Sequence, residues 1–144
     1  MSVKIQVSQV IDRPRADVFH FYAYEHVQNH PRWDPDMALE QISDGPIGVG
    51  TVIRRRNNHS GTPVEGTMEV VEFEPNRTMG VVIHDGPVET RGRVAFEAAG
   101  HNQTTITINA EFPGMDEETM DTSLLTSLIE RSARNIKSLI ESET

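Results

Sequence analysis

The sequence predicts an α+β fold in which a curved antiparallel sheet of seven strands wraps around one long C-terminal helix, with two short helices after the first strand. Turn-forming residues recur at fairly regular intervals between residues 44 and 102, which favours short connections between antiparallel neighbours. Several segments between these turns alternate apolar and polar residues, as half-buried strands do. From about residue 116 the apolar spacing becomes helical. The length of 144 residues suits one domain and no linker or repeat divides the chain, so we expect a single domain over residues 1–144.

The N-terminal part is expected to contain one strand and two short helices. Residues 2–11 alternate between apolar and polar side chains, which predicts a half-buried strand. Pro14 suits the first position of a helix because no amide donor is needed there, so a helix is expected over residues 15–24. The next stretch, residues 25–35, is polar and is interrupted by Pro31, which predicts a second short helix or a turn.

Six further strands are expected between the turns. They lie at about residues 38–43, 51–57, 64–73, 78–84, 88–98 and 103–112. In the last of them Ile106 and Ile108 share one face and polar residues share the other, so the sheet has one face in water. Glu69 and Glu72 are three positions apart and cannot share a face of a regular strand, which predicts a bulge near Val70.

The longest apolar stripe of the chain belongs to a helix expected from about Asp116 to Ile140. Such a helix is about 37 Å long, and only a broad sheet can cover it. The helix is expected to form the centre of the core and one wall of the pocket, with Leu128 near its middle. A curled sheet that closes on one helix leaves a gap that is hard to fill, so we expect a cavity there, and concave apolar cavities bind small ligands.

Composition restricts the partners. The chain has 13 basic and 22 acidic residues and a formal charge of −9, which disfavours nucleic acid and anionic membrane surfaces. It has no cysteine, so disulfides, thiolate metal sites and cysteine nucleophiles are excluded. No apolar run is long enough to insert into a bilayer, and the N-terminus lacks a signal peptide. A cytoplasmic protein is therefore expected, and its oligomeric state is not predicted.

Several short motifs occur in an order that matches a known family. The segments are Ile11–Pro14, Asp17–Phe19, Asn29–Pro35, Gly48–Thr51, Val70–Arg77, Gln103–Thr107 and Asn135–Glu141. With these, the chain resembles the START-related (SRPBCC) superfamily, in particular its polyketide cyclase/dehydrase-like bacterial members. The resemblance implies the helix-grip fold with an internal cavity. It does not imply one activity, because members include cyclases, lipid and hormone binders and chaperone activators.

Candidate ligand-binding residues are those that the expected elements direct toward the cavity. They are Phe19, Tyr22, Trp33, Met68, Met79, Val81, Val94, Phe96, Ile106, Ile108, Leu124, Leu125, Leu128 and Ser132. Trp33 could equally fill one end of the core. Ser132 could equally bond its own backbone one turn back.

Three consecutive arginines on one expected strand provide a candidate anion site. Strand alternation places Arg54 and Arg56 on one face and Arg55 on the other. We expect Arg54 and Arg56 to face the cavity and to favour an anionic ligand, although alternation alone does not decide which face points inward. The competing interpretation puts the inward arginine at the strand end, in solvent.

Histidines provide little expected chemistry. His26 and His30 have the spacing of a helical metal pair, but Pro31 disfavours helical geometry at His30. We therefore expect solvated loop histidines, and neither a metal nor a cofactor. Tyr22 and His84 are the candidate catalytic residues. His84 borders a hairpin turn, where a turn-forming role already explains the neighbouring Asp85.

Three functions are consistent with these features. The first is the binding of a small hydrophobic or aromatic molecule by a carrier or sensor. The second is a polyketide cyclase or dehydratase that uses acid–base groups in the cavity. The third is a protein-interaction module. Two titratable groups in hydrogen-bond contact inside the cavity would favour the second, and a cavity filled by side chains would favour the third.

Overall fold

The computed structural model describes residues 2–143, and this part of the chain contains seven strands, three α-helices and one π-helical turn. In chain order they are β1 (Ser2–Ile11), α1 (Arg15–Phe19), the π-helical turn η1 (His20–Tyr24), α2 (His26–Trp33), β2 (Met37–Gln41), β3 (Val52–Asn57), β4 (Val64–Glu74), β5 (Thr78–Asp85), β6 (Val88–Gly100), β7 (Gln103–Pro113) and α3 (Thr122–Glu143). The predicted helix-grip fold is confirmed, and each predicted strand is present with its ends within two residues.

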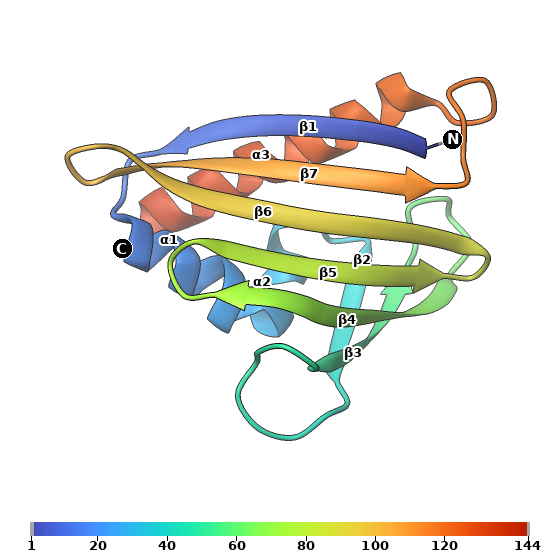
Figure 1. Ribbon diagram of the computed structural model, residues 1–144, viewed down its shortest axis with the longest axis horizontal. Coiled ribbons are helices and arrows are strands. Elements are labelled where there is room, and N and C mark those ends of the chain that lie inside the picture. Colours follow the sequence, from blue (N-terminus) through green and yellow to red (C-terminus); the bar gives the residue numbers. More distant parts are fainter. Residues whose placement is uncertain (1, 144) are drawn as a thin grey trace.

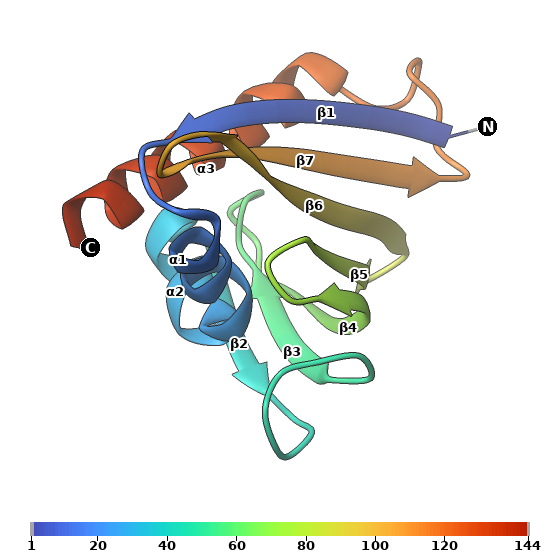
Figure 2. The same ribbon diagram turned by 60° about the vertical axis from the view of Figure 1, so that its left-hand side comes forward.

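All seven strands form one antiparallel sheet in the order β1-β7-β6-β5-β4-β3-β2. Consecutive strands from β2 to β7 are therefore neighbours, and β1 joins the far edge through β7. Figure 1 shows α3 lying behind this sheet, and Figure 2 shows the sheet curving from β1 to β2 while α1 and α2 close one end of its concave side. The predicted bulge is confirmed, because the register of β4 against β5 shifts between Val70 and Glu72. A bulge bends its strand and so helps the sheet to curve.

The segment after β1 stays helical through Pro31. The turn η1 arises because the Glu25 amide donates to the His20 carbonyl five residues back. The expectation that Pro31 moves His30 out of helical geometry is wrong, since α2 includes both residues. Burial explains the difference: α2 places His26, Asn29 and Trp33 against the core, and this packing offsets the hydrogen bond that proline removes.

The long helix begins later than predicted, at Thr122 instead of Asp116. The Asp116 carboxylate accepts the amides of Glu118 and Thr119, which closes a separate turn. Asp121 then caps α3, because its Oδ1 accepts the Leu124 amide at 2.9 Å. Acidic residues that suit the start of a helix thus form a turn and a cap in front of it. No helix in residues 2–143 combines the length and the apolar character that a bilayer span requires.

Only the C-terminal half of α3 is firmly buried. Ala133, Ile136 and Ile140 are at most 1% exposed, whereas Leu124 is 56% exposed. Leu124 lies about 100° around the helix from Leu125, which does face the sheet. Leu128, near the middle of the predicted helix, is half-buried and borders a cavity. The core is centred further along α3, where Ile136 packs with the cluster around Phe19.

We predict that the stability contribution of α3 rises along the helix. Ile136→Ala should lower the free energy of unfolding by about 3 kcal/mol, because it removes transfer energy and leaves a void. Leu124→Ala should change it by less than about 0.5 kcal/mol, and Leu128→Ala should fall between the two. Urea denaturation midpoints of the three variants test this order. Equal losses at Leu124 and Ile136 would contradict the burial pattern.

Candidate functional site

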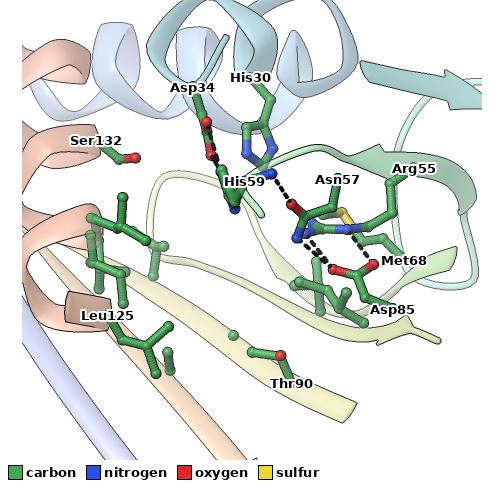
Figure 3. A pocket seen from close by; sticks show the side chains of 18 of the residues that line it. His30, Asp34, Arg55, Asn57, His59, Met68, Asp85, Thr90, Leu125 and Ser132 are labelled. Atoms are coloured by element: carbon green, nitrogen blue, oxygen red, sulfur yellow. Dashed lines mark hydrogen bonds and ion pairs between the residues drawn. The ribbon is translucent and has the colours of Figure 1, made fainter. Parts of the chain in front are cut away.

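A cavity of about 470 Å³ lies between α3 and the concave face of the sheet, a size typical of small-molecule sites. Its apolar wall consists of Met68, Met79, Val81, Ile83, Val94, Ile108, Leu125, Leu128 and Ile129. A polar end is formed by residues of α2, β3 and the loop after β3 (Figure 3). The cavity therefore has an apolar part and a polar part.

Strand alternation and one glycine produce the cavity floor. Met79, Val81 and Ile83 follow one another at every second position of β5 and line the cavity. Val81 lies opposite Gly92 of β6. A Cβ at Gly92 would lie 3.3 Å from the Val81 side chain, so glycine leaves space at this point of the floor.

The central polar feature is a buried ion pair between Arg55 and Asp85. Arg55 donates from Nε and from Nη2 to the two carboxylate oxygens, each at 2.9 Å. Asn57 Nδ2 donates to the same carboxylate at 3.1 Å. The two charged side chains are 9% and 15% exposed, and a bidentate geometry of this kind suits a buried arginine. The pair links β3 to the end of β5.

The expectation that Arg54 and Arg56 face the cavity is wrong. Both point to solvent, where Arg54 lies 3.2 Å from Glu40 and Arg56 lies 2.8 Å from Glu65. The reason lies in Ile53, which is fully buried in the core. Residues two apart in a strand share a face, so Arg55 follows Ile53 inward.

A second pair joins His59 to Asp34. The His59 Nε2 atom lies 2.7 Å from Asp34 Oδ2 and 2.9 Å from Oδ1. Asp34 ends α2, and His59 lies in the loop after β3. The hydrogen bond to Asp34 raises the pKa of His59 above its usual value, although partial burial works against this rise.

Asp36 brings a third possible ligand group to this pair. One donor atom each from Asp34, Asp36 and His59 lies within 4.8 Å of the others. Two carboxylates and one imidazole suit a divalent cation. However, the imidazole nitrogen and both oxygens of Asp34 already bond each other, so a metal ion would have to replace that contact.

A stack of aromatic and histidine rings forms the wall next to α2. Trp33 stacks with Tyr22 and with His30, each at a centroid distance of 5.1 Å. His26 Nδ1 contacts the Tyr22 carbonyl at 2.8 Å, and its Nε2 lies 3.0 Å from His30 Nδ1. The expectation of solvated loop histidines is therefore wrong, because His26 is 3% exposed and His30 faces the cavity.

Burial sets the protonation of this ring stack. It lowers the pKa of His26 to about 4, and burial, together with the nearby titratable groups His26, Arg55 and His59, lowers the pKa of His30 well below its usual value. Both rings are thus neutral at pH 7. Burial raises the pKa of the Tyr22 phenol, so Tyr22 remains a hydrogen-bond donor and does not act as a base.

The structure brings most of the predicted ligand-binding residues together. The cavity is lined by Tyr22, Trp33, Met68, Met79, Val81, Val94, Ile108, Leu125, Leu128 and Ser132. Trp33 both borders the cavity and, at 3% exposure, fills the core. Among residues 2–143 the Ser132 hydroxyl forms no hydrogen bond, so it does not bond its own backbone one turn back.

Other predicted residues lie elsewhere. Phe19, Phe96 and Ile106 are fully buried in the core beside the cavity, and the Phe19 and Phe96 rings contact each other at 5.0 Å. Leu124 is exposed. The candidate His84 is also exposed, and its Nε2 lies 3.5 Å from Glu89. His84 alternates with Ile83, which lines the cavity, so strand geometry turns it outward.

Sequence reasoning missed the polar residues that define the site: His26, His30, Asp34, Arg55, Asn57, His59 and Asp85. For two groups a signal exists. Ile53, Arg55 and Asn57 occupy every second position of β3 and so share one face. The apolar Ile53 indicates that this face points inward. His26, His30 and Trp33 are spaced by four and three, as on one face of a helix. Asp34 directly follows α2, and Asp85 is the last residue of β5. The pairing of Asp34 with His59 and of Asp85 with Arg55 depends on tertiary structure.

A family model described as polyketide cyclase/dehydrase and lipid transport matches residues 2–141. The chain belongs to this family. The resemblance to the SRPBCC superfamily is thereby confirmed, and the polyketide cyclase/dehydrase family provides the ligand-binding fold described above. No curated protein matches the sequence.

Solved structures share the family fold at low identity. The structure of Ara h 8.0201 has a TM-score of 0.78 at 14% identity, with 99% of this chain and 100% of that chain covered. Norcoclaurine synthase from Thalictrum flavum, in complex with dopamine and hydroxybenzaldehyde, has a TM-score of 0.78 at 17% identity, with 100% of this chain and 89% of that chain covered. The ZhuI aromatase/cyclase from Streptomyces sp. R1128 has a TM-score of 0.75 at 12% identity, with 98% of this chain and 94% of that chain covered. These likenesses support the fold alone.

We predict that the ion pair is required for stability. Arg55→Met should lower the free energy of unfolding by about 3–5 kcal/mol, because it leaves the Asp85 charge buried without its partner. The surface control Arg56→Met should cost less than about 1 kcal/mol. Replacing both partners, with Arg55→Met and Asp85→Leu, should recover much of the loss. Urea denaturation measures all three, and equal effects of the two single variants would contradict a buried pair.

We also predict acid-sensitive stability from the His26 imidazole. A histidine with a lowered folded pKa stabilises the fold above its unfolded value of about 6.5, and this stability is lost as the pH falls from there toward 4. Between pH 7 and pH 5 the parent should lose about 2 kcal/mol more than His26→Gln. The exposed control His101→Gln should lose as much stability as the parent between pH 7 and pH 5. Identical losses in parent and His26→Gln, measured by urea denaturation at both pH values, would show that His26 is not buried neutral.

Proposed function

We propose that this chain binds a small, mainly apolar, aromatic molecule in the cavity and serves as a carrier or sensor of it. One observation carries the proposal: a cavity of about 470 Å³ with apolar walls contains polar groups that have no partner within residues 2–143. Apolar walls drive a ligand out of water, and a few polar groups fix its orientation.

The unpartnered groups specify what the ligand must offer. Among residues 2–143, the hydroxyls of Tyr22, Thr90 and Ser132 form no hydrogen bond, and all three residues line the cavity. The Arg55 Nη1 atom is similarly without a protein acceptor, because Nε and Nη2 make the contacts to Asp85. A ligand with one or two carbonyl or hydroxyl oxygens can bond to these groups.

The charges favour a neutral ligand. The case for an anionic molecule depended on Arg54 and Arg56, which point to solvent. The inward Arg55 has its counter-ion in Asp85, and His59 has Asp34. A carboxylate at the polar end would therefore lose its hydration without meeting an uncompensated cation there, whereas Arg131 lines the cavity from α3.

The relatives are consistent with an aromatic ligand. The norcoclaurine synthase structure contains dopamine and hydroxybenzaldehyde, and a further neighbour is an aromatase/cyclase. A cyclase or dehydratase is the second candidate function, and it is favoured by titratable groups in hydrogen-bond contact inside the cavity. These are the pairs His26 with His30 and Asp34 with His59. An interaction module receives less support, because side chains leave the cavity unfilled.

Adjacent valines on β5 provide a matched test. Val81 lines the cavity, and Val82 points to the other face of the sheet. The neutral dye N-phenyl-1-naphthylamine should bind the parent with one-to-one stoichiometry in a calorimetric titration. Val81→Trp should weaken binding at least about tenfold by occupying the cavity, and Val82→Trp should leave it unchanged. A parent that binds neither this dye nor other neutral aromatics would refute the proposal.

A further inference from the structure

The Asp34–His59 pair has the geometry of a proton-transfer dyad. The Nε2 atom of His59 lies within 2.7–2.9 Å of both Asp34 oxygens, so this nitrogen carries the proton that binds the carboxylate. Asp34 is 7% exposed. Among residues 2–143 no group hydrogen-bonds to Nδ1 of His59, which leaves this atom to exchange protons. Figure 3 shows His59 between Asp34 and the open middle of the cavity.

The backbone around His59 is held in place, as a catalytic group requires. The His59 amide donates to the Asn57 side-chain oxygen at 2.9 Å, and Asn57 in turn binds Asp85. The neighbouring Asn58 amide donates to the Asp36 carbonyl at 2.9 Å. The loop is thus tied to the ion pair on one side and to the end of α2 on the other.

Arg55 completes the arrangement with a donor for a developing negative charge. Asp85 fixes its guanidinium through Nε and Nη2, and Nη1 lies on the other edge of the group. Arg55 and His59 both line the polar end of the cavity, so both can act on one bound molecule. A fixed donor of this kind stabilises an oxyanion without having to reorient.

From this arrangement we propose that the Asp34–His59 dyad removes and returns a proton at the carbon next to the carbonyl of a bound aromatic ketone, with Arg55 receiving the enolate oxygen. The inference rests on the proposed function, because the ketone must occupy the cavity. His59 would be the catalytic residue, and Asp34 would be a positioning residue.

The chemistry balances without another reactant. Neutral His59 takes the proton through Nδ1, the C–H electron pair becomes the carbon–carbon double bond of the enolate, and the carbonyl π pair moves to oxygen. Asp34 stabilises the imidazolium that forms. Return of a proton from Nδ1 restores the ketone. In D₂O the Nδ1 proton exchanges with solvent deuterium before its return, so the net result is the replacement of C–H by C–D, with the released proton passing to the solvent.

The charged groups around His59 set its working pH. Asp34 and Asp36 favour the protonated ring, whereas Arg55 and partial burial oppose it, and the first influence is larger. His30 is neutral at pH 7, and Arg131 of α3 also lines the cavity. The balance keeps the pKa of His59 above its usual value. The neutral, basic form of His59 therefore increases as the pH rises through this raised pKa.

The test uses 2-tetralone, an aromatic ketone with acidic α-protons. Its exchange in D₂O is followed by proton NMR, and its binding is followed by Trp33 fluorescence. The parent should accelerate exchange at least about 100-fold over buffer, with a rate that rises with pH. His59→Gln should abolish the acceleration and retain binding, whereas the exposed control His101→Gln should keep both. Asp34→Asn should shift the pH dependence to lower pH, which a purely structural defect would not do.

The outcomes separate the two proposals. Binding of 2-tetralone without acceleration by the parent would overturn the dyad and leave the proposed function standing. Acceleration that survives in His59→Gln would overturn the assignment to His59. Failure of the parent to bind 2-tetralone and the neutral dye would overturn the proposed function and, with it, the inference that depends on it.

Discussion

The concave face of a strongly curved sheet is wider than one helix can cover, and the rest of this structure depends on that constraint. The C-terminal half of α3 fills one part of the face through Ala133, Ile136 and Ile140. The segment α1–η1 fills another part, where the Phe19 ring packs on Phe96. The N-terminal half of α3 spans what remains, and its side chains Leu125, Leu128 and Ile129 line a cavity there. Because protein interiors are otherwise packed as densely as crystals, a space of about 470 Å³ follows from the geometry of the fold and not from poor packing.

The charged groups at the polar end of the cavity enter it in pairs. Removing a charge from water is costly unless a partner and hydrogen bonds compensate for it, and each inward charge at the polar end has such a partner on another element. Arg55 and Asp85 join β3 to β5, while His59 and Asp34 join the loop after β3 to α2. The pairs therefore fix the mouth of the cavity as well as neutralise it. A ligand meets fixed dipoles and single free donor atoms there, which favours recognition of neutral oxygen atoms over recognition of net charge.

The fold was predictable because its signals are local. Turn residues, strand alternation and the helical stripe each act over a few residues, and they indicated every strand and the bulge at Val70. The apolar part of the site follows from the same signals. The polar part does not, because alternation leaves two faces and cannot tell whether Arg55 or its neighbours point inward. That choice depends on which face of β3 packs on the core, and the buried Ile53 decides it. Likewise, a proline rule that holds for isolated segments failed at Pro31, where burial of His26 and Trp33 outweighs one lost hydrogen bond.

The three histidines at the cavity show how one environment gives the same side chain different roles. His26 uses both ring nitrogens within the protein, toward the Tyr22 carbonyl and toward His30, and burial keeps it neutral. His30 is neutral for the same reason and stacks on Trp33. His59 differs, because a carboxylate holds one nitrogen and raises its pKa while the other nitrogen has no protein partner among residues 2–143. When neighbouring titratable groups have pKa values pushed apart, the environment separates structural groups from those that can exchange protons. On this basis His26 and His30 support the aromatic wall, and His59 is the histidine that can exchange a proton with a bound molecule.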